Sequence, residues 1–341
     1  MVVHKTLKYI VSLILVLLIS TATWAQDIHF SQFYAAPMVL NPAETGNFDA
    51  DWRFSNIYRN QWRSIDVPYQ TISVGFDRQF FLFTERFSGG IDIVYDHSVD
   101  AALTVNKIYI SLAYHKKIKE NNFHFGIQGG PVLKAYNIDN LTFPSQWDRN
   151  SGSFNSSLPN NVANNNDNLA YADINAGVIW SRNFGRIKPH IGYSAYHINY
   201  PKESFLETEN KLPLRNVAHI SALVNINETI FVRPHILYMG HKKATDLILG
   251  TNLGMNLPTN PLSIQKAFVG GYFRNDFNFN ADATYFVVGL GFKHLEFGLS
   301  YDVNISTLKS ATSGRGAFEV SVIYKSASTI LNKLTVPCNR Y

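Results

Sequence analysis

The feature that most constrains this chain is a two-residue alternation of apolar with polar or small side chains. Apolar side chains occupy every second position in residues 91–95, 108–114, 286–292 and 297–303. Successive side chains of a β-strand point to opposite faces, so this pattern predicts strands with two chemically different faces. Helical periodicity is hard to find. The sequence therefore predicts an all-β protein.

The alternating segments divide the chain into about fourteen candidate strands. They span residues 51–59, 69–78, 88–97, 106–116, 123–136, 169–183, 186–200, 214–227, 228–240, 244–256, 264–275, 280–293, 294–305 and 315–325. Several reach ten residues, whereas strands usually have about 5–6. A strand that crosses a bilayer at a tilt needs about 9–11 residues. Strand length thus favours a transmembrane barrel.

Composition narrows the fold to two classes. Charged residues are 16%, well below the roughly 25% of ordinary soluble domains, and aromatic residues are 14%. Beyond residue 25, no segment is apolar for long enough to be a membrane helix. These values suit a secreted β-sandwich or a transmembrane β-barrel, whose lipid-facing residues alternate with lumen-facing ones. The net charge of +5 includes no basic block, which argues against a nucleic-acid partner.

The connections between the candidate strands favour the barrel. In outer-membrane barrels both termini face the periplasm, so external loops follow the odd-numbered strands and are longer. Here the longest connection, residues 137–168, follows the fifth strand, whereas residues 183–186 and 293–296 are short even-numbered turns. Residues 78–88 are an exception, an apolar stretch expected to pack under the barrel rim. We therefore predict a closed antiparallel transmembrane β-barrel of about 14 strands.

The predicted barrel divides the chain into four segments. Residues 1–25 are predicted to be a cleaved signal peptide, since basic residues precede an apolar run that is shorter than a membrane helix. Residues 26–50 are predicted to be an irregular segment that plugs the barrel or lines its rim. Residues 51–325 form the barrel, and residues 326–341 form a periplasmic tail. The only cysteine, Cys338, excludes an intramolecular disulfide.

The sequence contains no recognisable catalytic or metal-binding motif. Its eleven histidines form no HExxH element, and the odd offset of His190 and His197 puts them on opposite faces of one strand. We therefore expect no catalytic residue, metal or cofactor. A hydrolase that uses Ser111, His115 and Asp92 stays open as a distant alternative, because catalytic triads are spatial rather than sequential. The Asn-rich residues 155–168 are interpreted as a solvated loop rather than a calcium-binding one.

Charged residues within the alternating strands are expected to face the lumen. There, partners or water avoid the cost of placing a charge in lipid. The residues concerned are Asp92, Asp96, Lys134, Asp173, Arg233, Arg274, Asp282, Asp302 and Glu319.

An ordered series of short motifs resembles the PorP/SprF family of outer-membrane proteins associated with type IX secretion. The series begins with a QDxxFSQ stretch, continues with an NPA-x-x-G element at residues 41–46, and includes a YRxQW segment on the first strand. Glycine-rich strands at residues 125–130 and 173–177 are also similar. The candidate partner-binding residues carried by the resemblance are Gln26, Asp27, Phe30, Ser31, Gln32, Asn41, Pro42, Tyr58, Arg59, Asn60, Gln61 and Trp62.

The resemblance implies a non-enzymatic role in protein export at the outer membrane of a Gram-negative bacterium of the Bacteroidota. The implied partners are other type IX secretion components, outer-membrane lipid, and a secreted cargo with a C-terminal sorting domain, such as a large adhesin. A role in gliding motility is also implied for some members. The alternative hypothesis is a diffusion or uptake channel for small solutes, which would need an open, wet lumen.

Overall fold

The computed structural model describes residues 28–61, 68–98, 103–136, 142–159, 168–205, 209–242, 244–257, 264–275, 281–306, 309 and 314–327. The predicted signal peptide, residues 62–67 and most of the predicted tail lie outside this part of the chain. No helix within it is long and apolar enough to cross a membrane.

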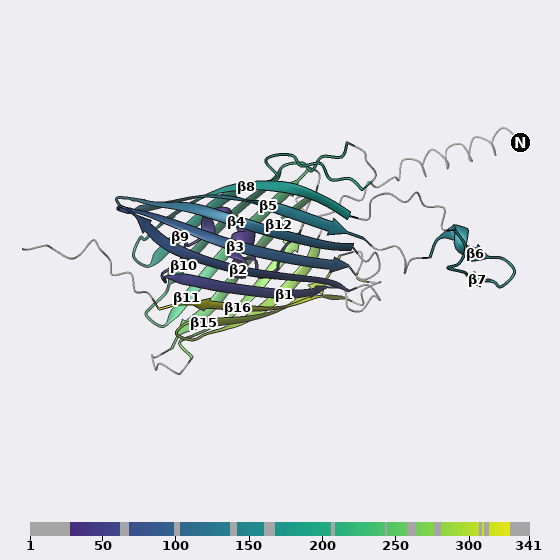
Figure 1. Cartoon of the computed structure of the whole chain (residues 1–341). Coiled ribbons are helices and arrows are strands. Elements are labelled where there is room, and N and C mark those ends of the chain that lie inside the picture. The colour runs from purple at the N-terminus through teal and green to yellow at the C-terminus, as the bar shows by residue number, and fades with distance from the viewer. Residues whose placement is uncertain are drawn as a thin grey trace, which may run out of the picture.

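Fourteen antiparallel strands close into one barrel (Figure 1). The strands are β1 (Trp52–Gln61), β2 (Tyr69–Leu82), β3 (Glu85–Ser98), β4 (Leu103–Ile118), β5 (Asn121–Ala135), β8 (Asn168–Arg182), β9 (Ile187–Tyr196), β10 (Arg215–Asn225), β11 (Ile230–His241), β12 (Ala244–Asn256), β13 (Lys266–Asn275), β14 (Ala281–Gly291), β15 (Leu295–Asn304) and β16 (Arg315–Lys325). Each predicted strand corresponds to one of these. Pairing of β1 with β16 closes the barrel.

The two ends of the barrel differ. Tight turns at residues 83–84, 119–120, 183–186 and 292–294 gather at one end, which we call the short-turn end. The opposite end carries most of the longer connections, although His241 of β11 pairs with Ala244 of β12 across a short connection there. One of the longer connections holds a 3₁₀ turn, η3 (Pro144–Gln146), and a separate two-stranded sheet of β6 (Trp147–Asp148) and β7 (Ser153–Phe154) (Figure 1).

The expectation for residues 78–88 was wrong. They do not pack under the rim but extend β2 and β3 into a long hairpin, with Leu82 paired with Glu85 across the turn. Phe83 at its tip is 94% exposed. The apolar run was hard to interpret because its two strands meet in a turn that contains neither Gly nor Pro.

The alternation seen in the sequence separates the two surfaces of the wall. On β14, Phe286, Val288 and Leu290 are exposed on the outer surface, whereas Tyr285 and Val287, at alternate positions, are buried inside. The outer face is thus apolar, as a lipid-facing wall requires. The inner face is mixed, because charged residues such as Asp173 and Glu319 are buried there beside aromatic ones.

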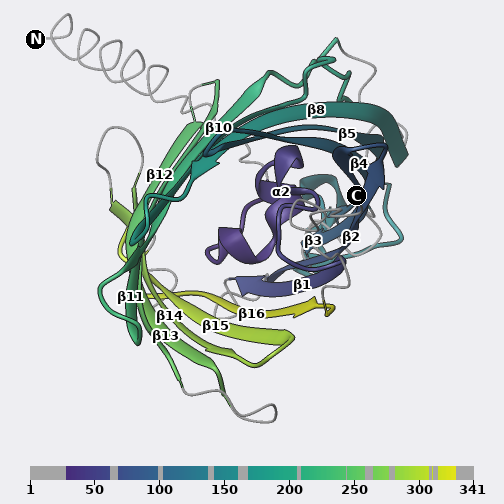
Figure 2. The same ribbon diagram turned by 90° about the vertical axis from the view of Figure 1, so that its left-hand side faces the viewer.

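Residues 28–50, here called the inner segment, lie inside the barrel (Figure 2). The segment contains three short turns: η1 (Phe33–Ala35), α2 (Pro37–Leu40) and η2 (Pro42–Glu44). Pro37 and Pro42 each begin a turn, where a missing N–H costs nothing and the fixed backbone angle favours a helix. Phe33 packs into an apolar cluster on the inner face of β9–β14 that includes Leu237, Ile248 and Tyr285.

Candidate functional site: the inner segment and its anchors

The beginning of the inner segment is held by two acidic side chains of the barrel wall. The Glu319 carboxylate on β16 accepts hydrogen bonds from the backbone N–H of Ser31 at 2.7 Å and of Gln32 at 2.8 Å. The Ser31 hydroxyl donates to the carboxylate of Asp302 on β15 at 2.7 Å. Hydrogen bonds to ionised acceptors are roughly twice as strong as neutral ones. The first residues of the segment are therefore fixed firmly to the wall.

Arg59 on β1 pairs with both carboxylates, and Arg274 on β13 pairs with Asp302 as well, at 3.4 Å. Nη1 of Arg59 donates to Glu319 at 2.5 Å and its Nη2 to Asp302 at 3.3 Å. The side chains of Arg59, Glu319 and Asp302 are at most 3% exposed. Buried charges are tolerated only when they are paired and hydrogen-bonded, and this cluster meets that condition. We call β1, β15 and β16 the charged wall.

Gln32 adds uncharged hydrogen bonds to the same wall. Its side-chain amide donates to the Ser300 hydroxyl at 3.2 Å and accepts from the Ser321 hydroxyl at 2.9 Å. Beside it, Phe30 packs against Ile57 and Ile323. Apolar packing and polar pairing therefore act together at this wall.

The second half of the inner segment meets a different surface, on β5, β8 and β9, here called the glycine wall. A Cβ atom added to Gly177 would lie 1.9 Å from Oδ1 of Asn41, and one added to Gly126 would lie 2.3 Å from the carbonyl carbon of Pro42. Only glycine allows the backbone of the segment to approach this closely. The glycine-rich strands of the family resemblance thus face the NPA element.

Side chains of the glycine wall also donate to carbonyl groups of the inner segment. The Tyr196 hydroxyl donates to the Val39 carbonyl at 2.7 Å, and the Ser194 hydroxyl to that of Leu40 at 3.1 Å. Asn41 closes the turn that follows, since its Oδ1 accepts from the Ala43 N–H at 2.9 Å. Backbone groups of a short buried turn need such partners because water cannot reach them.

The end of the inner segment is fixed by ionic contacts near the short-turn end. The carboxylate of Asp77 on β2 accepts from the Gly46 N–H at 2.6 Å and from Nη2 of Arg53 at 2.7 Å. Arg86 donates to the Gly46 carbonyl at 2.6 Å. Gly46 itself has φ +69, a left-handed conformation that favours glycine. The chain then passes directly into β1.

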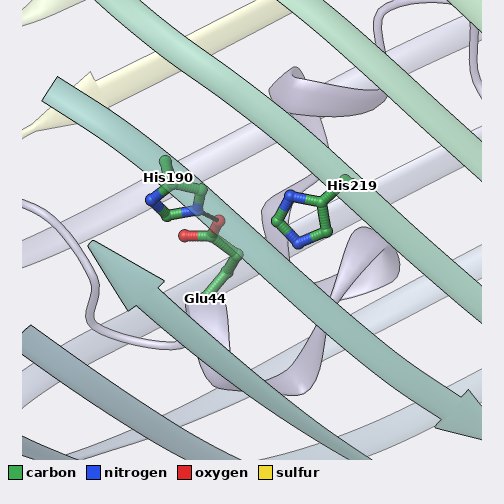
Figure 3. A group of neighbouring side chains, drawn as sticks. All are labelled: Glu44, His190 and His219. Atoms are coloured by element: carbon green, nitrogen blue, oxygen red, sulfur yellow. Dashed lines mark hydrogen bonds and ion pairs between the residues drawn. The ribbon is translucent and has the colours of Figure 1, made fainter. Parts of the chain in front are cut away.

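Three potential metal ligands meet where the segment touches β9 and β10. Glu44, His190 and His219 place one ligand atom each within 4.8 Å of the others, and their side chains converge in Figure 3. Burial alone would raise the pKa of Glu44, but the adjoining His190, 2.7 Å from its Oε1, lowers that pKa to about 2. Glu44 is therefore a carboxylate at neutral pH. The sequence predicted no such group.

This cluster borders a cavity of about 310 Å³ between the inner segment and the wall. Its lining is largely basic and aromatic, and includes Tyr34, Arg53, Lys188, His190, Arg233 and His235. The rings of Tyr34 and His235 stack with centroids 5.3 Å apart. The residues of β9 and β11 that line the cavity lie in the halves of these strands nearer the short-turn end, and those of β10 begin at His219 near the middle of that strand.

The structure places most of the candidate partner-binding residues in the anchors. Phe30, Ser31, Gln32, Asn41 and Arg59 are at most 3% exposed and contact other parts of this chain. Pro42 is also buried, and the side chain of Gln61 accepts a hydrogen bond from Arg59. Tyr58 and Asn60 contact each other on the outer side of β1. Partner binding by these residues stays a prediction. Gln26, Asp27 and Trp62 lie outside the described residues.

The sequence profile described as type IX secretion system membrane protein PorP/SprF matches residues 22–324. Among curated proteins, none is significantly similar to this chain in sequence.

Several solved structures resemble the barrel. The CymD monoaromatic hydrocarbon channel aligns over 86% of this chain and 93% of its own, with 11% identity and a TM-score of 0.49. A deltaS2 mutant of the TodX monoaromatic hydrocarbon channel aligns over 86% and 94%, with 10% identity and a TM-score of 0.48. Omp33 of Acinetobacter baumannii aligns over 81% of this chain and 98% of its own, with 6% identity and a TM-score of 0.41. At this level of identity such a likeness concerns the fold alone.

Proposed function

Because this chain belongs to the PorP/SprF family of type IX secretion system membrane proteins, we propose that it helps secrete a cargo protein or hold it at the cell surface. The chain is an outer-membrane β-barrel. In the proposed role it acts without catalysis, beside other type IX secretion components. Its cargo is a protein with a C-terminal sorting domain, such as a large adhesin, whose display could support gliding motility.

The observation that carries the proposal is the way the inner segment is held. Glu319, Asp302 and Arg59 are buried inside the barrel and joined by ion pairs, and the two carboxylates accept hydrogen bonds from residues 31 and 32. Phe33 extends the contact into the apolar cluster on β9–β14. A diffusion channel needs a wet lumen, whereas a protein that serves cargo can keep its barrel plugged. We assign the inner segment the role of a plug.

A deletion strain tests the role in cargo export. We expect the cognate cargo to disappear from the surface, and either accumulate in the periplasm or be released into the medium, and expect the wild-type gene to restore display. Uptake of small hydrophilic solutes should be unchanged. Normal cargo display combined with lost solute uptake would instead support the channel hypothesis.

A second experiment tests the plug directly. Wild-type protein in planar bilayers should show little conductance, and a variant lacking residues 28–48 should show discrete open-channel steps. A variant lacking residues 144–158, which hold the separate β6–β7 sheet, is the matched deletion control and should stay closed. Large conductance by the wild-type protein would contradict the plug assignment.

A further inference from the structure

We propose that Glu44, His190 and His219 bind one divalent transition-metal ion, with zinc as the best match, between the inner segment and the barrel wall. Two imidazoles and one carboxylate form a ligand set that zinc uses in proteins, usually with water as the fourth ligand. Imidazole nitrogen does not suit magnesium or calcium, which prefer oxygen ligands. The inference stands apart from the role in secretion.

The strand register brings the two histidines together. On the paired strands β9 and β10, Gly192 lies opposite His219, and His190 lies opposite Ser221. The two histidines are therefore diagonal neighbours on the inner face, and their ring centroids are 5.5 Å apart. Gly192 provides the necessary space, since a Cβ there would lie 2.1 Å from Nε2 of His219.

Glu44 reaches this pair from the inner segment. It is the last residue of η2, and Arg53 holds the carbonyl group of Glu44 with a hydrogen bond of 2.9 Å. Asn41, at the start of the same turn, places its Nδ2 3.3 Å from Nε2 of His219. Neighbours that orient a ligand side chain commonly tune metal affinity. A metal ion here would join the segment to two wall strands.

The adjacent cavity supplies access and a place for the fourth ligand. Its volume of about 310 Å³ holds water easily, and Glu44, His190 and His219 all line it. The cavity also contains the positively charged Lys188 and Arg233, which favour an anion or hydroxide at the open position. The Glu44 carboxylate offsets part of their repulsion toward the metal ion.

The test uses the full chain, purified in detergent without a polyhistidine tag. After treatment with a chelator, the protein is dialysed against Zn²⁺ and its metal content is measured by atomic emission. We expect one ion per chain, and expect Co²⁺ to give the visible absorption of a four-coordinate site. The variants Glu44→Gln and His190→Asn should each weaken binding more than the roughly 10- to 100-fold loss typical of changes outside the ligands.

His235→Asn is the matched control. His235 lines the same cavity but is not one of the three ligands, so this variant should keep the wild-type affinity. Heat-modifiable migration in gel electrophoresis checks that each variant forms a barrel, and binding is compared only among folded proteins. Failure of the wild-type protein to retain zinc, or an equal loss in His235→Asn, would overturn the proposal. Neither result would alter the test of cargo export.

Discussion

The two walls that hold the inner segment differ in kind. At the charged wall, the carboxylates of Glu319 and Asp302 accept hydrogen bonds from residues 31 and 32. At the glycine wall, Gly126 and Gly177 let residues 41 and 42 come within a distance that any side chain would prevent. One wall holds the segment by electrostatics and the other by shape.

This difference predicts which substitutions most weaken the contact between the inner segment and the barrel. A buried ion pair is strong while it is complete, but loss of one partner leaves an unpaired charge that strongly favours contact with water. Overpacking of a close-packed surface costs less stability, because backbone and side chains can shift by small amounts to accommodate the added atoms. We therefore expect changes at the charged wall to have the larger effects.

The largest effect is expected for Arg59→Ala. It removes the ion pair of Glu319 and leaves Asp302 with Arg274, which should lower the free energy of unfolding by about 3–5 kcal/mol. Denaturant-induced unfolding in lipid vesicles measures the change. Arg59→Lys keeps the charge and should lose less. Equal stability of Arg59→Ala and wild-type protein would show that the charged wall does not depend on this cluster.

Val320→Arg tests the outer face of the charged wall independently of the contacts that this wall makes with the inner segment. Val320 lies between Glu319 and Ser321 on β16 but points outward, where an Arg at the midplane of the bilayer costs roughly 2–4 kcal/mol. We expect impaired barrel assembly, visible as reduced heat-modifiable migration, and the same for Leu290→Arg. Normal assembly of both variants would contradict the assignment of the outer face.

Gly126→Val probes the glycine wall. The added side chain would meet the backbone of Pro42, and overpacking of this kind typically costs about 1–3 kcal/mol. We expect the inner segment to become accessible to added protease while the barrel stays folded. The control is Gly271→Val, because an added Cβ there has no neighbour within 4 Å. If the control were cleaved as readily, the cause would be general loosening.

The smallest effect is expected for Tyr196→Phe. This change removes one neutral hydrogen bond, from the Tyr196 hydroxyl to the Val39 carbonyl, and should cost about 0.5–1.5 kcal/mol. The change is measured by the same vesicle unfolding experiment. A loss as large as that of Arg59→Ala would mean that the two walls do not differ in the way proposed.

The barrel could be predicted from the sequence because its signal is local. The alternation along β14 and β15 depends only on neighbouring residues, and it located every barrel strand to within a few positions. The family resemblance also identified Ser31, Gln32 and Arg59 as special. It did not reveal their role, because Ser31 and Glu319 are 288 residues apart in the sequence.

The cluster of Glu44, His190 and His219 was missed for a related reason. The odd offset of His190 and His197 predicts opposite faces of one strand, but this was wrong: β9 ends at Tyr196, and His197 is buried beside Asp173. The useful comparison was between neighbouring strands, since His190 and His219 both belong to the inward-facing series. That comparison requires the register of β9 and β10, which no local pattern supplies. Glu44 could be added only once the path of the inner segment was known.

The contact of residues 31 and 32 with β16 has a consequence for the order of folding. The beginning of the inner segment binds Glu319 on the last strand of the barrel, and that strand also pairs with β1. The full set of bonds at the charged wall cannot form until the last strand has arrived. Seating of the segment therefore marks the completion of assembly, and an unfinished barrel would leave the first residues of the segment free for chaperones or proteases to recognise.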